Sequence, residues 1–139
     1  MKRKEIIAAA RKWLDVKWQH QGRNLAGIDC AGIVVNVAKE FGVPVDERTD
    51  YQRRTHGTQF LQRFRDCFDE KPVPSLREGC IVTLTEPAFP CHCGIISRKH
   101  GELYLIHAYA KRRKVVEERF DDLWRDKLVA VFDYPGVED

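Results

Sequence analysis

The stretch Ile28-Asp29-Cys30-Ala31-Gly32 decides how this chain is interpreted, because it places a cysteine where a loop becomes a helix. Asp29 is a favoured N-cap residue. Apolar residues then recur at helical spacing as far as Phe41, and Gly42 supplies a stop. The Cys30 sulfur is therefore expected beside the positive end of a helix dipole, which lowers the pKa of a thiol and favours the reactive thiolate.

Helices come first along the chain and strands follow. Apolar spacing predicts amphipathic helices at residues 4–14, 30–41 and 58–68, with a loop at 16–28. From Gly79 onward the pattern is that of strands, predicted at 81–84, 92–97, 102–108, 114–120 and 128–134, with a short helix at 121–124. This order predicts an α+β fold in which N-terminal helices pack on an antiparallel sheet of about five strands.

Size and composition indicate a single folded domain over residues 1–139, with 43% hydrophobic and 32% charged residues. Long disorder is excluded, and no segment reaches the length of a membrane span. The net charge of +3 does not indicate a nucleic-acid partner. The segment 1–11 is too short and too charged for a signal peptide, which predicts synthesis in the cytoplasm without a visible export signal.

The cysteines are predicted to be reduced, because their number is odd and no export signal is visible. They are Cys30, Cys67, Cys80, Cys91 and Cys93. The last three lie in apolar, strand-like runs, where a free cysteine behaves as a small hydrophobe. The order Cys91-His92-Cys93 suggests zinc, but adjacent strand residues point to opposite faces and cannot easily converge on one ion. No metal site is therefore predicted.

The most basic run is Lys111-Arg112-Arg113-Lys114, and it is followed at once by two glutamates. A solvated turn between strands is the favoured interpretation. A contact to an anionic partner, such as a wall polymer, and a nucleic-acid contact are the alternatives.

Two histidines, His92 and His107, lie in the two strands of a predicted hairpin. A two-residue loop, at 99–100 or at 100–101, puts both on one face of the sheet, whereas a three-residue loop puts them on opposite faces. Glycine at the second loop position favours the loop His100-Gly101, which pairs Gly94 with His107.

These residue types fit a thiol hydrolase. Cys30 would attack a carbonyl carbon, and His92 would take its proton and later protonate the leaving amine. His107 would bind the second ring nitrogen of His92 and fix its tautomer. The backbone N–H of Cys30 would help to stabilise the oxyanion, with a second donor from the side chain of His20 or Gln21.

Four blocks, in order, resemble those of the NlpC/P60 cell-wall peptidases, which are papain-like cysteine hydrolases. The blocks are Asp-Cys-Ala-Gly-Ile-Val at 29–34, Gly-Cys-Ile-Val at 79–82, His-Cys-Gly-Ile at 92–95 and Ile-His-Ala at 106–108. The resemblance covers residues 13–134. It implies a papain-like fold in which Cys30 is the nucleophile, His92 the base and His107 the orienting third member.

The resemblance also implies a thiol endopeptidase, without a cofactor, acting on the stem peptides of peptidoglycan, often between γ-D-glutamate and a diamino acid. The loop from Trp18 to Arg23 looks most like versions from bacteriophages and prophages, where the domain is associated with tail proteins. Delivery in a virion, with action at the cell wall, would fit the missing signal peptide.

The chain departs from the pattern of the family at three positions. Ala31 replaces a serine, and Cys80 replaces an acidic residue. Trp18 replaces a tyrosine, and the indole N–H of Trp18 can take the place of the tyrosine hydroxyl in part. Trp18 and Asp29 are expected with His20 and Gln21 in the oxyanion and substrate-binding region.

Residues 43–58 are expected to cover or line the groove, with Tyr51, Arg53 and Arg54 as lining side chains. Two other functions remain open from the sequence. One is a thiol hydrolase of another amide or of a thioester, and the other is a catalytically silent tail-assembly component with the same fold.

Overall fold

The computed structural model describes residues 1–45, 57–85 and 92–139, apart from the side chains of Gly57 and Thr58. The helices in these ranges are α1 (Arg3–Arg11), α2 (Cys30–Glu40), α3 (Gly57–Cys67) and α4 (Asp122–Arg125), with 3-10 turns η1 (Val73–Ser75) and η2 (Ala110–Arg112). The strands are β1 (Arg23–Asn24), β2 (Gly27–Ile28), β3 (Asp69–Lys71), β4 (Ile81–Leu84), β5 (His92–Lys99), β6 (Glu102–Tyr109), β7 (Lys114–Arg119) and β8 (Leu128–Asp133). None of these helices is long and apolar enough to cross a membrane.

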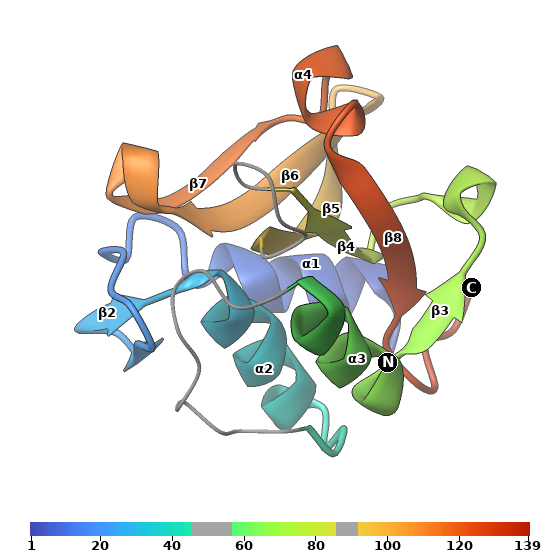
Figure 1. Cartoon of the computed structure of the whole chain (residues 1–139), viewed down its shortest axis with the longest axis horizontal. Helices are drawn as coiled ribbons and strands as arrows, with labels where there is room; N and C mark the ends of the chain where they lie inside the picture. Colours follow the sequence, from blue (N-terminus) through green and yellow to red (C-terminus); the bar gives the residue numbers. More distant parts are fainter. Residues whose placement is uncertain (46–56, 86–91) are drawn as a thin grey trace.

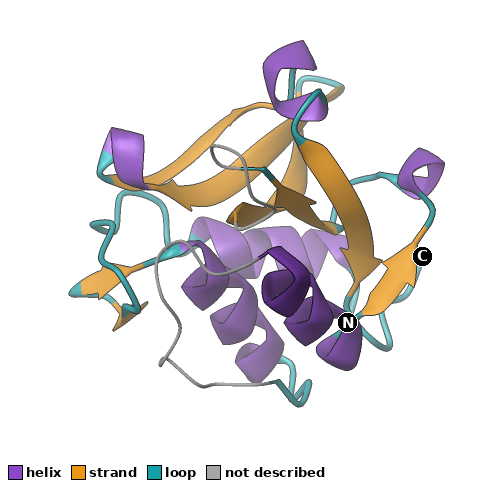
Figure 2. Cartoon of the chain, viewed as in Figure 1, coloured by secondary structure: helices purple, strands orange, loops and turns teal. Residues whose placement is uncertain are grey.

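An α+β architecture is confirmed, with α1, α2 and α3 gathered on one side of an antiparallel sheet (Figures 1 and 2). The order of the strands in that sheet is β3-β8-β4-β5-β6-β7. In the described part of the chain this sheet has six strands, where about five were predicted. The strand missed in this sheet, β3, has three exposed polar residues and no alternation, so only its pairing with β8 makes it a strand. The short β1–β2 hairpin lies within residues 16–28, which were predicted as a loop.

Local signals set the main element boundaries. The first helix was predicted to run to residue 14 but ends at Arg11, because the chain turns there and Asp15 adopts a φ of 70°. The predicted loop His100-Gly101 is confirmed, since Lys99 pairs with Glu102. Both loop residues have positive φ, 53° and 79°, as this hairpin turn requires.

The main core lies between the helices and the sheet. It contains residues such as Ile6, Ile33, Val37, Ile95 and Ile106, all with no exposed surface. The buried hydroxyl of Tyr134 donates a 2.7 Å hydrogen bond to the carbonyl of Val34, which joins the end of β8 to the middle of α2. Tyr134 is buried and its hydroxyl is hydrogen-bonded, so it helps to hold α2 against the sheet.

A second cluster covers the opposite face of the sheet, where Val82, Ile96, Leu105 and Val131 pack with Trp124 of α4. Because side chains alternate along a strand, the start of β5 presents neighbouring residues to the two faces. Cys93 belongs to the core on the helix side. The site described below forms where this end of β5 meets the N-terminus of α2.

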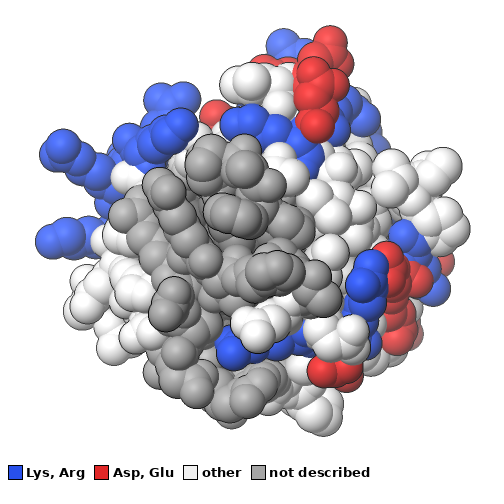
Figure 3. Space-filling model, in the orientation of Figure 1, with Lys and Arg blue, Asp and Glu red and all other residues white. Residues whose placement is uncertain are grey.

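The basic run predicted as a turn forms η2 and the start of β7, and its four side chains are exposed. Figure 3 shows lysine and arginine side chains gathered on this edge of the molecule. Arg112 lies 3.7 Å from Glu118, and Lys114 forms a 2.9 Å ion pair with Asp15. The turn is therefore confirmed, and its predicted anionic contact stays a prediction.

Candidate active site

Asp29 organises the loop that carries the candidate nucleophile. Its buried carboxylate accepts hydrogen bonds from the backbone N–H of Gly32 at 2.8 Å, from Arg23 Nη1 at 2.8 Å and from the backbone N–H of Gln21 at 2.9 Å. The first bond is an N-cap that begins α2, so Cys30 occupies the first helical position. The predicted helix start is confirmed, and Asp29 fixes the loop on both sides of it.

Gly32 lets the first turn of α2 pack directly on this loop. A Cβ atom at residue 32 would lie 2.6 Å from the carbonyl oxygen of Gly22 and 2.6 Å from Cγ1 of Ile28. Backbone cannot give way cheaply at that distance. Glycine is therefore required here by the close approach that holds Cys30 in place.

Residues 17–19 connect the nucleophile loop to the edge of the sheet. The backbone N–H of Trp18 donates to the carbonyl of Arg113 at 2.9 Å, and that of Gln19 donates to Ile28 at 3.0 Å. Trp18 thus lies next to the loop that carries Cys30.

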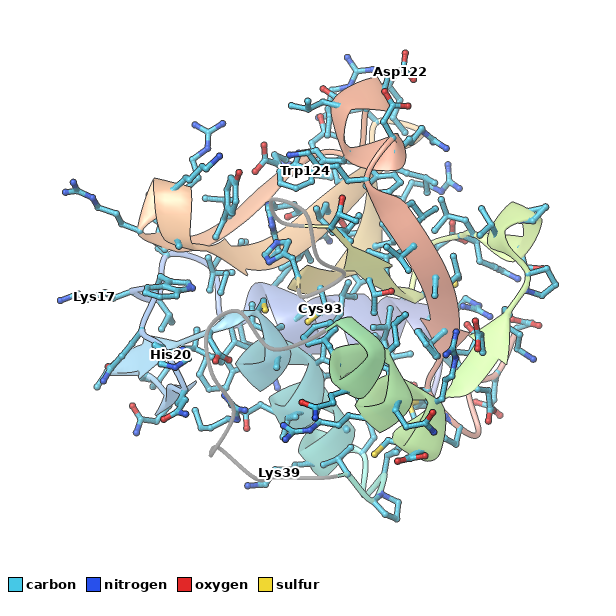
Figure 4. All side chains as sticks on the ribbon, viewed as in Figure 1. Lys17, His20, Lys39, Cys93, Asp122 and Trp124 are labelled. Atoms are coloured by element: carbon cyan, nitrogen blue, oxygen red, sulfur yellow. The ribbon has the colours of Figure 1, made fainter. Side chains whose placement is uncertain are left out.

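His20 and Gln21, the predicted side-chain donors to the oxyanion, lie in different surroundings. Figure 4 places His20 beside the β1–β2 hairpin, apart from Cys93 in the centre of the view. The backbone N–H of Gln21 is engaged by Asp29. The oxyanion and substrate roles assigned to the side chains of Trp18, His20, Gln21 and Asp29 stay predictions.

The two histidines of the predicted hairpin are in contact. His92 Nε2 lies 2.7 Å from His107 Nδ1, and both rings are buried. The register Ile95↔Ile106 puts Gly94 opposite His107, and a Cβ on Gly94 would lie 3.0 Å from His107 Cβ. The expectation that His92 and His107 share a face is confirmed, whereas their catalytic roles stay predictions.

Glu118 of β7 contacts the second of these histidines, and it was not predicted from the sequence. Its Oε2 lies 2.9 Å from His107 Nε2. His107 pairs with Val116, so Glu118 is its diagonal neighbour on the same face of the sheet. Counting across the second hairpin, as was done for the first, would have found this carboxylate.

Two aromatic side chains enclose the imidazoles. Tyr109 stacks on His107 with ring centroids 5.0 Å apart, and Trp124 meets His107 edge-on at 4.9 Å. Trp124 is only 3% exposed. This wall keeps bulk water from the His92–His107 contact, and neither residue was predicted to belong to the site.

No protein-family model and no curated protein sequence matches the chain. Among solved structures, an NlpC/P60 family protein from Bacillus cereus superposes with a TM-score of 0.69 and 14% identity, covering 95% of this chain and 40% of that one. The NlpC/P60 domain of the peptidoglycan hydrolase SagA superposes with a TM-score of 0.69 and 16% identity, covering 96% of this chain and 99% of that one. The chain has the NlpC/P60 fold.

Other structures with this fold extend the comparison. An N-acetylmuramoyl-L-alanine amidase from Bacteroides uniformis superposes with a TM-score of 0.61 and 14% identity, covering 94% of this chain and 96% of that one. The chain spans only 40% of the Bacillus cereus protein and 42% of a Staphylococcus aureus NLP/P60 family protein. At these identities the likeness establishes the NlpC/P60 fold.

Within this NlpC/P60 fold, the environment of Cys30 favours its thiolate. A hydrogen bond from the Cys93 thiol lowers the pKa of Cys30, burial opposes that effect, and the hydrogen bond and charge of His92 lower the pKa further, to about 5. Burial and the neighbouring Cys30 raise the pKa of Cys93 well above its ordinary value, so Cys93 stays protonated and donates. Cys93 was predicted only as a small hydrophobe, and this contact was missed.

His92 is the second hydrogen-bond partner of Cys30. Burial lowers the pKa of His92, while its hydrogen bond to Cys30 and the charge of that residue raise it. The net result is a lowered pKa for His92, with burial as its largest cause.

We expect the rate of Cys30 alkylation by iodoacetamide to be half-maximal at about pH 5, because only the thiolate reacts. An ordinary cysteine reaches half its maximal rate at about pH 8.5. Mass spectrometry of the Cys30 peptide after timed alkylation measures the profile. A midpoint at about pH 8.5 would show that the thiolate is not stabilised.

Some predictions concern residues outside the described ranges. Tyr51, Arg53, Arg54 and Cys91 lie there, so the predicted groove lining and the role of Cys91 are left as predictions. Across residues 1–45, 57–85 and 92–139, no three His, Cys, Asp or Glu side chains are grouped so that they could hold a metal ion.

Proposed function

We propose that this chain is a cysteine hydrolase that cleaves peptide bonds in peptidoglycan. The observation that carries the proposal is a helix-start thiol of lowered pKa beside an imidazole that a second imidazole orients. Two proteins with the same fold, named a peptidoglycan hydrolase and an N-acetylmuramoyl-L-alanine amidase, support the choice of substrate.

The first half of the reaction forms a thioester. His92 Nδ1 takes the proton of the Cys30 thiol, the thiolate adds to the carbonyl carbon of the peptide bond, and the carbonyl oxygen takes the negative charge. The backbone N–H at the start of α2 faces this oxyanion, since helix-start N–H groups have no partner within the helix. When the C–N bond breaks, the proton on His92 Nδ1 passes to the leaving nitrogen, and a free amine departs.

The second half restores the enzyme. A water molecule gives one proton to His92 Nδ1 while its oxygen adds to the thioester carbon. The C–S bond then breaks, which releases the Cys30 thiolate and a carboxylic acid, and the acid loses its proton to solvent to become a carboxylate. His107 remains hydrogen-bonded to His92 Nε2 throughout, so the imidazole keeps one orientation in both halves.

The bond between γ-D-glutamate and a diamino acid is the proposed target, and stem peptides are the proposed partners. Action at the cell wall and association with a phage or prophage tail are finer proposals. They rest on the resemblance of the Trp18–Arg23 loop. Another amide or a thioester as substrate, and a silent structural role, are the competing functions.

Digestion of purified peptidoglycan, followed by mass spectrometry of the soluble products, tests this function. We expect peptide fragments that carry new amino groups and new carboxylates in equal number, because each turnover produces one of each. Release of peptides ending at γ-D-glutamate would identify an endopeptidase. Release of sugar chains freed of peptide would identify an amidase. Absence of both, with Cys30 alkylated readily at about pH 5, would contradict peptidoglycan as the substrate.

A further inference from the structure

We propose that Glu118 is a positioning residue that fixes the tautomer of His107 and thereby directs Nδ1 of His92 toward Cys30. The inference rests on the proposed hydrolase function for its kinetic consequence. Its structural consequence, the protonation pattern of the two histidines, can be measured without any substrate.

The geometry forms a continuous row across three strands. Cys30 of α2 is hydrogen-bonded to His92 of β5. His92 Nε2 lies 2.7 Å from His107 Nδ1 on β6, and His107 Nε2 lies 2.9 Å from Glu118 Oε2 on β7. Both distances are those of ordinary hydrogen bonds.

The chemistry of the row decides where each proton lies. An ionised carboxylate only accepts, so Glu118 requires a hydrogen on His107 Nε2. Neutral His107 then has a lone pair on Nδ1, which accepts the N–H of His92 Nε2. His92 Nδ1 is left for Cys30, where it can take the thiol proton and return it to a leaving group.

Several neighbours hold the Glu118 carboxylate. Oε2 binds His107, whereas the nearest approach of Arg112 is 3.7 Å and is made to Oε1. The Trp124 side chain also hydrogen-bonds to Glu118. These neighbours hold the carboxylate in place, and the hydrogen bond from His107 is the main cause of its lowered pKa.

Other titratable and charged groups face the row from every packed element. They are Asp29 at the start of α2, Cys93 on β5, Tyr109 on β6, Arg112 on η2 and Lys127 between α4 and β8. The charge of Lys127 acts against the protonated form of His92. The negative charge of Glu118, transmitted through its hydrogen bond with His107, opposes this effect and stabilises His92 as the acid of the acylation step.

Imidazole ¹⁵N NMR of the wild type and of Glu118→Gln tests the tautomer. In the wild type at about pH 7 we expect His107 to carry its hydrogen on Nε2 and His92 to carry a hydrogen on Nε2. In Glu118→Gln the amide NH2 can donate to His107 Nε2, so we expect a fraction of His107 to switch to the Nδ1–H form. Wild-type His107 in the Nδ1–H form would overturn the proposal.

Peptide hydrolysis as a function of pH tests the consequence. We expect Glu118→Gln to lower kcat by about 10- to 100-fold, the range seen when the outer partner of a metal-bound histidine is removed. The alkaline limb of the profile should move to lower pH, because loss of the negative charge destabilises protonated His92. Glu118→Asp should recover part of the rate if its shorter side chain still reaches His107.

Two controls separate positioning from loss of charge or of fold. Glu102→Gln removes an exposed carboxylate that pairs with Arg119 at 3.1 Å on the same sheet, and it should change kcat by less than about twofold. In a His107→Gln background, Glu118→Gln should have almost no additional effect, since its target is gone.

The outcomes also distinguish this inference from the proposed function. If the wild type cleaves no peptidoglycan but shows the expected tautomers, and Glu118→Gln changes them, the positioning role stands and the substrate is wrong. If Glu118→Gln keeps the wild-type tautomers and pH profile, the positioning role is wrong and the hydrolase can stand. Full effects of Glu118→Gln in the His107→Gln background would likewise overturn the inference.

Discussion

Cys30→Ala is expected to reduce peptidoglycan cleavage by at least about 10⁴-fold, because removal of a covalent nucleophile leaves only binding and oxyanion stabilisation. The fold should be retained. The side chain is only partly buried, and its replacement should change the free energy of unfolding by about 1 kcal/mol or less. Product release measured by mass spectrometry, together with a urea unfolding curve, checks both statements.

Cys67→Ala is the matched control for that experiment. Cys67 is also a partly buried free cysteine, at the end of α3, and belongs to no part of the row that contains His92. Its replacement should leave turnover unchanged. Turnover retained in Cys30→Ala, or an effect confined to assembly with other proteins, would instead favour the silent structural role.

Much of the scaffold could be predicted because its signals are local. Asp29 is the N-cap residue that marks the start of α2, and the turn residues His100-Gly101 set the register of the β5–β6 hairpin. That register brings His92 and His107 to one face. Runs of apolar residues bounded by turn residues then delimit β4 to β8 to within a few residues.

The rest depends on tertiary contacts that carry no local signal. The strand β3 is recognisable only from its pairing with β8. Glu118 becomes part of the site through the register of a second hairpin, and Cys93 through its contact with the start of α2. In a sequence these two residues resemble a surface glutamate and a core cysteine, and only their neighbours change that interpretation.

Arg3→Ala is expected to lower the free energy of unfolding by about 3–5 kcal/mol, because it leaves a buried carboxylate without its partner. Arg3 Nη1 and Nη2 bind the two carboxylate oxygens of Asp133, each at 3.1 Å, and both residues are 8% exposed. Nη1 also donates to the carbonyl of Glu78 at 3.2 Å. Urea unfolding measures the loss. Arg65→Ala, which breaks an exposed ion pair with Glu70, is the control and should have little effect.

The double variant Arg3→Met, Asp133→Leu separates the two possible causes of that loss. If the uncompensated charge of Asp133 is responsible, replacing both residues by apolar ones should restore most of the stability. Cys80 Sγ, a weak donor that binds Asp133 Oδ1 at 3.3 Å, would then lose its acceptor at little cost. If lost packing of the Arg3 stem against Gly79 is responsible, methionine should restore stability even while Asp133 remains. Recovery in the double variant but not in Arg3→Met alone would therefore assign the effect to the buried charge, and the reverse result would contradict it.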